Sequence, residues 1–225
     1  MAVLFIAVLV WLAIHLGLAG TRLRDAVVAR IGEGPFRVLF SLLSIAAIWF
    51  LIRAWAKAPT VPVWYSPGWL RWILVFVMLP AFVLFVASLS GRNPTMVGGE
   101  NTTGQQVRGI QRVTRHPMLW SFALWAAVHV AGNGDAASIL FFGAILVSAL
   151  AGMPSIDAKL ARRNPALSQT LSTATSIIPF VAIAEGRNRL VASEIGWVTP
   201  LIGVAAWAVL LRLHPLLFGV APVAM

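Results

Sequence analysis

Residues 69–89 have the sequence WLRWILVFVMLPAFVLFVASL, in which Arg71, near the start, is the one charged side chain. An apolar run of about 20 residues is long enough to cross the hydrocarbon core of a bilayer as a helix. Pro80 lies inside the run and predicts a kink, because proline cannot donate the backbone hydrogen bond of its turn. This stretch therefore predicts a membrane-spanning helix.

Five other stretches are equally apolar, at residues 2–20, 36–52, 117–132, 136–152 and 195–213. Asn133, Gly134 and Asp135 form a polar turn between two of them, which predicts a helical hairpin. The composition agrees, because 60% of the residues are hydrophobic and 11% charged, whereas roughly a quarter of the residues in a soluble domain are charged. We expect an all-α fold, a polytopic membrane helical bundle with about six transmembrane helices, forming a single domain over residues 1–225.

The basic residues predict an orientation for this bundle. Of the 17 Lys and Arg residues, 13 fall in the alternate connections 21–37, 90–116 and 153–194, and 4 fall on the other side. Because positive loops stay in the cytoplasm, both termini are predicted on the outer, periplasmic side. The tryptophans clustered around the outer connection 53–68 agree, since they favour the membrane interface. The more polar segment 166–185 is predicted to lie along the cytoplasmic interface without crossing.

Composition also excludes several classes of function. The chain has no cysteine, which excludes disulfides, thiolate nucleophiles, zinc–thiolate sites and covalent haem attachment. A net charge of +10 could suggest nucleic acid, but the basic residues lie in the connections, so the lipid bilayer is the expected partner and nucleic acid is not. The seven carboxylates fall in connections or at helix edges, which argues against a proton pump.

Histidines are the candidate functional residues. His15 and His129 lie within apolar runs, whereas His116 opens the fourth predicted helix and His214 closes the sixth. A polar ring in hydrocarbon needs a partner, so an intramembrane histidine predicts a site. The alternative is a hydrogen bond to a neighbouring helix, which is favoured for His116 and His214. Histidines on separate helices also suit axial ligation of a b-type haem, since no cysteine competes.

Depth leaves the ligand pair open. At about 1.5 Å per helical residue, His15 lies about 10 Å from the cytoplasmic surface and His129 roughly 20 Å along its helix. His129 and His214 both fall near the outer edge and fit at least as well. For Arg115 and His116, the alternative is a helix start with Thr114 as the N-cap. A helix start explains the arginine but not the histidine.

Several motifs are distributed over nearly the whole chain. Residues 112–120 have the sequence RVTRHPMLW and are followed by Leu124-Trp125, His129 and the turn at 133–135. The further stretches are IDAK at 156–159, TSIIPF at 175–180 with Gly186-Arg187, and HPLLFGVAP at 214–222. Together these motifs resemble those of the NnrU family. The resemblance implies a protein of the bacterial inner membrane that supports denitrification. Nitrite and nitric oxide reductase components are its implied partners.

The same domain resembles 15-cis-zeta-carotene isomerase, a haem b enzyme. By this resemblance, His15 and His129 occupy the positions of the haem ligands, with His116, His214 and Arg115 as neighbouring cofactor-binding candidates. A third histidine of that enzyme aligns with Ala123 here. The resemblance therefore implies haem b more readily than isomerisation.

Three hypotheses follow. The first is a haem b-binding membrane protein that supports denitrification. The second is a non-enzymatic accessory protein that binds a partner through basic residues of its cytoplasmic loops, namely Arg108, Arg112, Arg162 and Arg163. The third is a polyene isomerase, or a membrane methyltransferase, since Arg-His-Pro also occurs in isoprenylcysteine-type methyltransferases. For the latter, the chain offers Asp157 and Ile178-Pro179, while its one tyrosine, Tyr65, lies on the outer side.

Overall fold

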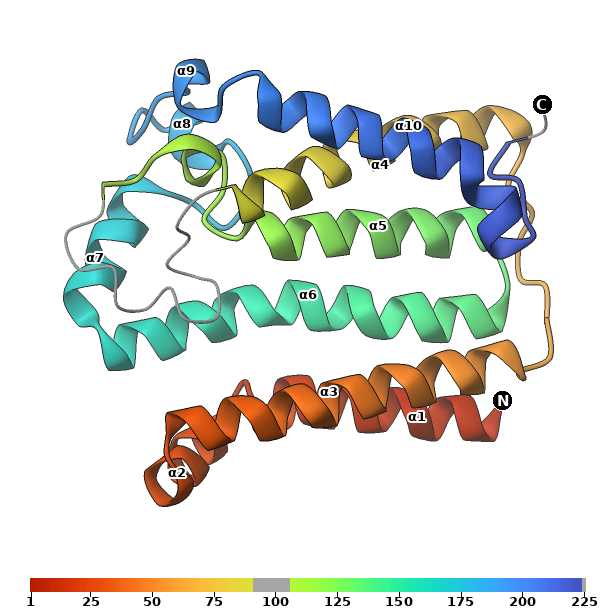
Figure 1. The fold of residues 1–225 in the computed structure, drawn as a ribbon, viewed down its shortest axis with the longest axis horizontal. Coiled ribbons are helices and arrows are strands. Elements are labelled where there is room, and N and C mark those ends of the chain that lie inside the picture. Colours follow the sequence, from red (N-terminus) through yellow and green to blue (C-terminus); the bar gives the residue numbers. More distant parts are fainter. Residues whose placement is uncertain (91–105, 224–225) are drawn as a thin grey trace.

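The computed structural model describes residues 1–90 and 106–223, and within these ranges its regular elements are helices. Six long segments lie side by side along the longest axis of the molecule, and both termini lie at the same end (Figure 1). They are α1 (Ala2–Leu12) with its π-helical continuation η1 (Ala13–Leu18), α3 (Glu33–Ala56), α4 (Gly68–Leu89), α5 (Pro117–Asn133), α6 (Ala136–Arg163) and α10 (Val198–Phe218). The predicted all-α fold is confirmed.

Four of these helices, α3, α4, α6 and α10, are long and apolar enough to cross a membrane. A fifth crossing is counted if α1–η1 and α2 (Arg22–Ile31), which are bent by 74° at their break, form one span. The fourth predicted run is α5, which has 17 residues and lies between α4 and α6 (Figure 1). Each of the six predicted apolar runs is thus helical, and four or five of them meet the criteria for a span. The membrane orientation stays a prediction.

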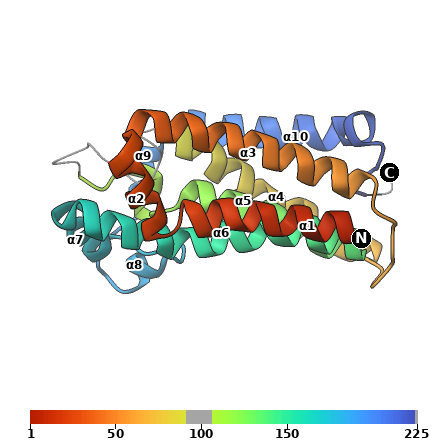
Figure 2. The same ribbon diagram turned by 90° about the horizontal axis from the view of Figure 1, so that it is seen from below.

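The shorter elements gather at the end opposite the termini. Figures 1 and 2 show α2, α7 (Pro165–Ala174), α8 (Val181–Ala184) and α9 (Ala192–Ile195) there, and the 3-10 turn η3 (Gly109–Arg112) precedes α5. The segment 166–185, which was predicted not to cross the membrane, therefore lies at one end of the bundle and does not run along it. The connection predicted at 21–37 is itself largely helical. It contains α2, which begins after Thr21, whose hydroxyl accepts a hydrogen bond from Leu23 N–H.

The fifth predicted run ends later than the sequence indicated. Helix α6 continues past Gly152 and Pro154 to Arg163, because its last turns make polar contacts with α2 and with the start of α5. Proline inside a helix removes one backbone bond and need not end the helix where neighbours hold it. Asp157 therefore lies within a helix, and its placement in a connection was wrong.

The predicted hairpin between α5 and α6 is confirmed. Gly134 adopts the left-handed conformation that ends α5, with φ +69°, and the Asp135 carboxylate caps α6 by accepting from Ser138 N–H at 2.9 Å. The Gly134 carbonyl accepts from the backbone of both Val63 and Trp64. The turn thus holds the loop that links α3 to α4.

Helix α6 is central to the packing. It packs against α5, α1 and α3, while α4 lies between α5 and α10. The largest core cluster joins α1, α3, α5 and α6 through Leu4, Leu51, Ala126, Phe141 and their neighbours. Many large apolar side chains face outward, including Ile45 and Trp49, each 64% exposed. Such an exterior suits a lipid environment, in which small residues set how closely helices approach.

Candidate functional site

His15 lies in the π-helical turn η1, where Ala19 N–H donates to the carbonyl of Ile14, five residues back. Its Nδ1 lies 2.9 Å from the carbonyl oxygen of Trp11, and its ring stacks on the Trp11 indole at 3.7 Å. The ring of Phe40 in α3 lies edge-on at 5.6 Å. Single π-helical turns inside α-helices are frequent at functional sites. The local backbone therefore marks His15 independently of the sequence.

His129 repeats this arrangement near the other end of the bundle. Its Nδ1 lies 2.7 Å from the carbonyl oxygen of Trp125, four residues back. Its ring lies 4.8 Å from the Trp125 ring and stacks on Phe142 of α6 at 4.7 Å. In both sites a carbonyl can only accept, so Nδ1 carries the proton and Nε2 presents a lone pair. Among the described residues, no hydrogen bond reaches either Nε2.

His214 lies near the same end of the bundle as His129, since α5 and α10 both end there (Figure 1). It is the last histidine of α10, and its Nδ1 lies 2.7 Å from the carbonyl oxygen of Val220, which follows the end of the helix. Its ring lies 4.7 Å from Phe218. The two histidines predicted near the outer edge thus lie at the end of the bundle that holds the termini (Figure 1).

His15 and His129 lie at different heights. Helix α1 runs parallel to α6, with Trp11 bonded to Ser148 and Gly20 bonded to Ser155. His15 is therefore level with about residue 151 of α6, whereas His129 stacks on Phe142. Nine helical residues correspond to about 14 Å along the axis. The two imidazoles thus differ in height by about that distance, and within the described ranges they share no aromatic neighbour.

A polar cluster forms where α5 begins. His116 is 2% exposed, and its Nε2 lies 2.9 Å from Oδ1 of Asp157 in α6. Arg115 Nε lies 3.3 Å from Oδ2 of the same carboxylate. Burial lowers the pKa of the Arg115 guanidinium. The negative charge of Asp157 raises this pKa, and the positive charge of nearby Arg187 lowers it further. Nδ1 of His116 is buried with no hydrogen-bond partner among the described residues.

The segment after α7 covers this cluster. Thr114 donates to the carbonyl of Ile177 at 2.7 Å, and the Trp120 indole donates to the same oxygen at 2.8 Å. The N-cap residue of α5 is His116, so the alternative in which Thr114 caps this helix does not hold. Thr114 reaches across to the Ile177 carbonyl instead, while its oxygen accepts from His116 N–H at 3.3 Å. Phe180, at the end of this segment, adopts the left-handed backbone conformation with φ +66°.

The basic loop residues proposed to contact a partner make internal contacts. Arg112 binds Glu194 with two hydrogen bonds and Asn188 with a third, and Arg162 and Arg163 bind Asp25 and Glu33. Arg108 lies 3.4 Å from the side chain of Gln106. These arginines stabilise the packing of the connections, which leaves fewer of their donors for another protein.

Sequence reasoning missed one repeated motif. Both intramembrane histidines follow a tryptophan by four residues, as WLAIH at 11–15 and WAAVH at 125–129. Residues four apart lie on one face of a helix, so the spacing predicts the tryptophan–histidine pairs that the structure contains. Phe40 and Phe142, by contrast, come from other helices and carry no such signal. Among the residues described, no group of three or more His, Asp or Glu side chains could hold a metal ion.

Comparisons with known proteins identify related sequences. A family model described as "NnrU protein" matches residues 3–222. The chain is 28% identical over 188 residues to "15-cis-zeta-carotene isomerase, chloroplastic" of Arabidopsis thaliana, covering 81% of this chain and 50% of that protein. It is 24% identical over 197 residues to the protein of the same name from Zea mays, covering 84% and 52%. The chain thus spans about half the length of these relatives. No solved structure matches it.

Proposed function

The chain belongs to the NnrU family, and from this membership we propose that it is a membrane-embedded protein that changes the configuration of a double bond in a lipid-soluble polyene. Its relatives from two plants are named as isomerases of 15-cis-zeta-carotene. Because the chain spans half of each, the activity is carried over to it only as a proposal. The apolar exterior suits a substrate that is dissolved in the bilayer.

One observation carries this proposal, the pairing of a free imidazole nitrogen with flat aromatic surfaces inside the bundle. His15 and His129 each fix the proton on Nδ1 against a carbonyl and present Nε2 unbonded. Each ring lies within contact distance of a tryptophan and of a phenylalanine from a second helix. Aromatic faces and edges favour flat conjugated molecules, and a polyene and a porphyrin both belong to that class.

Each of the two histidines, taken alone, is suited to bind the iron of the haem b that the family resemblance implies. A carbonyl bond at Nδ1 fixes the ring and the tautomer of a metal-binding histidine, as it does here at Trp11 and Trp125. The separation of His15 and His129 does not fit two ligands on one iron. We therefore propose haem binding at His129, with His214, near the same end of the bundle, as the candidate second imidazole. When bound, haem supplies a redox-active iron whose axial ligands set its potential.

The protein's own residues bind and orient the reacting molecule. The Trp125 carbonyl keeps the His129 lone pair on Nε2, and the Trp125 and Phe142 rings exclude water from the neighbouring space. A polyene lying against such rings is held flat, with its double bonds beside the imidazole. On the other side of the bundle, Trp11 and Phe40 do the same for His15.

A reduced-minus-oxidised spectrum of the protein, purified in mild detergent from haem-replete cells, tests the cofactor. We expect a Soret band that is lost in His129→Ala and weakened in His214→Ala. His15→Ala serves as the matched variant, because it removes the other half-buried histidine of the same type. Folded protein without a Soret band contradicts haem binding, and loss of the band in His15→Ala with retention in His214→Ala contradicts the assigned pair.

Isomerisation is tested separately with a polyene that has a central cis double bond, incubated with the protein in liposomes. Chromatography of the extracted pigment is expected to show the trans product with the wild-type chain and none with His129→Ala. Unchanged substrate with haem-loaded, folded protein contradicts the isomerase and leaves the cofactor result standing. A role in denitrification, its reductase partners and a bacterial inner-membrane location stay predictions that rest on the family resemblance.

A second candidate, a membrane methyltransferase, is favoured by one specific arrangement. The structure places the Arg115-His116 pair against Asp157 and beside Ile177, which adjoins Ile178-Pro179. Tyr65 lies in the loop between α3 and α4, 82% exposed and in the part of the chain that contacts the α5–α6 turn. Calorimetric titration with S-adenosylmethionine tests it. Binding that His116→Gln abolishes would support this candidate, and absence of binding would remove it.

A further inference from the structure

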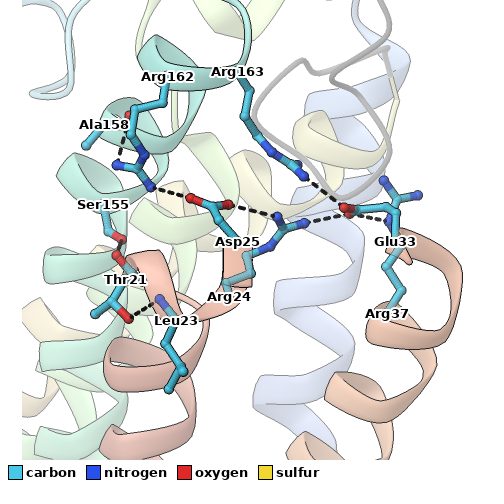
Figure 3. Close-up of polar contacts among 11 residues, drawn as sticks. Thr21, Leu23, Arg24, Asp25, Glu33, Arg37, Ser155, Ala158, Arg162 and Arg163 are labelled. Atoms are coloured by element: carbon cyan, nitrogen blue, oxygen red, sulfur yellow. Dashed lines mark hydrogen bonds and ion pairs between the residues drawn. The ribbon is translucent and has the colours of Figure 1, made fainter. Parts of the chain in front are cut away.

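Six charged residues meet where α2 turns back into α3 and reaches the end of α6. They are Arg24, Asp25, Glu33, Arg37, Arg162 and Arg163, and we call them the Arg24 cluster. Figure 3 shows their side chains pointing toward one another from three helices. The cluster lies at the end of the bundle that carries most of the basic connections, opposite the two termini (Figure 1).

Two carboxylates hold the four guanidinium groups together. The Glu33 carboxylate forms ion pairs with Arg24, with Arg37 Nε at 3.1 Å and with Arg163 Nη2 at 2.9 Å. The Asp25 carboxylate forms an ion pair with Arg162 Nη2 at 3.3 Å and lies 3.6 Å from Arg24 Nη1. Because both acids are shared, no arginine of the cluster has a carboxylate to itself. The cluster carries two surplus positive charges.

Arg24 anchors the cluster from inside. It is 5% exposed, and its guanidinium lies 5.0 Å from the centre of the Phe36 ring. Its Nη1 is buried and has no hydrogen-bond partner within the described ranges. A buried guanidinium is costly unless its charge is compensated. The observed carboxylates compensate for Arg24 only in part, since they also serve three other arginines.

The outer arginines are accessible. The side chains of Arg37, Arg162 and Arg163 are 41%, 37% and 28% exposed. Each guanidinium has five N–H donors in a planar fork that matches a phosphate group. The observed hydrogen bonds occupy only part of that fork in Arg37 and Arg162. The guanidinium groups of Arg162 and Arg37 lie at the two sides of the cluster, beside Asp25 and Glu33 (Figure 3).

We propose that the Arg24 cluster binds the phosphate of an anionic phospholipid headgroup. Arg37, Arg162 and Arg163 contact the phosphate, and Arg24 positions them through the shared acids. The cluster lies at one end of the apolar helices α3 and α6, the depth at which headgroups lie, and basic pockets between membrane helices recognise such lipids. A headgroup with two phosphates, as in cardiolipin, neutralises the surplus of two charges.

Arg22 and Arg30 make a matched control. They lie on α2, the helix that carries Arg24 and Asp25, and their side chains are exposed outside the cluster. General attraction to an anionic surface depends on all of these charges alike. A built site depends on Arg37 and Arg163 and not on Arg22 or Arg30. Removing two charges from either pair lowers the net charge equally, so the comparison separates the two explanations.

Native mass spectrometry of the full chain in detergent, titrated with cardiolipin, phosphatidylglycerol or phosphatidylcholine, tests the proposal. We expect retention of cardiolipin and, more weakly, of phosphatidylglycerol, but not of phosphatidylcholine. Arg37→Gln with Arg163→Gln should weaken cardiolipin binding by about tenfold, from the loss of charged hydrogen bonds. Arg22→Gln with Arg30→Gln should leave it unchanged.

Equal weakening in both pairs of variants overturns the proposal, as does equal retention of the three lipids. Inorganic phosphate is the competing source of the same chemistry, and displacement of the lipid by millimolar phosphate overturns the assignment to a headgroup. If the double variant fails to fold, Arg37→Gln alone is compared with Arg30→Gln. Arg37 is partly exposed, and Glu33 keeps its contacts with Arg24 and Arg163 in that variant.

Discussion

His116 Nε2 lies 2.9 Å from Asp157 Oδ1, a bond that joins the start of α5 to the second half of α6. Asp157→Ala removes the partner of a histidine that is 2% exposed and one ionic partner of Arg115. A buried polar group left without its partner costs about 1–3 kcal/mol. We expect a loss of stability of this size, measured by circular dichroism during thermal unfolding in detergent.

His116→Gln is the informative companion variant, because an amide can still donate to Asp157. It should destabilise the protein less than Asp157→Ala does. If Asp157→Ala leaves the midpoint of thermal unfolding unchanged, the contact contributes nothing measurable, and its role in joining α5 to α6 is wrong.

Glu194 should make the structure around η3 and α9 sensitive to acid. Hydrogen bonds from the Arg112 side chain, followed by one from Gly109 N–H, lower the pKa of Glu194 from 4.5 to about 2. A group whose pKa is lowered on folding stabilises the folded state above its unfolded pKa. That contribution is lost as the pH falls from about 4.5 toward 2. We expect the thermal midpoint to drop in this window.

Glu194→Gln isolates this effect, since it removes the charge and keeps a side chain of similar size. The variant should be less stable at neutral pH and should lose less stability on acidification. Parallel curves for the two proteins from pH 6 to pH 3 would show that other carboxylates cause the acid sensitivity.

Phe180 adopts φ +66°, a conformation in which a side chain with a Cβ is strained. Its ring is 55% exposed, so little packing is lost when it is removed. Phe180→Gly should relieve a strain of about 1 kcal/mol. The expected result is a higher thermal midpoint for Phe180→Gly than for Phe180→Ala, which removes the ring but keeps Cβ. Equal midpoints would mean that the turn stores no strain.

Most of the fold could be predicted from the sequence because lipid and water impose a strong pattern. Long apolar runs must be helices in a bilayer, since their backbone groups have no water to bind. The polar turn at Asn133–Asp135 and the basic ends of the helices followed the same logic. The end of α6 was missed, because Pro154 predicts a break where contacts of Ser155 with Gly20 and of Arg162 with Asp25 in α2 keep the helix intact.

The candidate site was only partly predictable. Spacing along a helix places Trp11 with His15 and Trp125 with His129, because both partners belong to one element. The contact of His116 with Asp157, 41 positions later, depends on how α5 and α6 are arranged. The height of His15 relative to His129 likewise depends on the packing of α1 against α6. Pairing of side chains between helices carries no local pattern, so it required the structure.

Helices α4 and α10 approach closely at Gly203, where an added Cβ would lie 2.8 Å from the Cα of Val83. Trp207, one turn further along α10, donates to the backbone carbonyl of Val75 at 2.9 Å and fixes the same contact. Gly203→Ala should separate the helices and cost about 1–3 kcal/mol. Gly143→Ala in α6, where nothing lies within 4 Å, should instead stabilise by up to about 1 kcal/mol, because alanine is the better helix former. The midpoint of thermal unfolding, measured for both variants, tests this difference. Similar midpoints for the two would contradict close packing at Gly203.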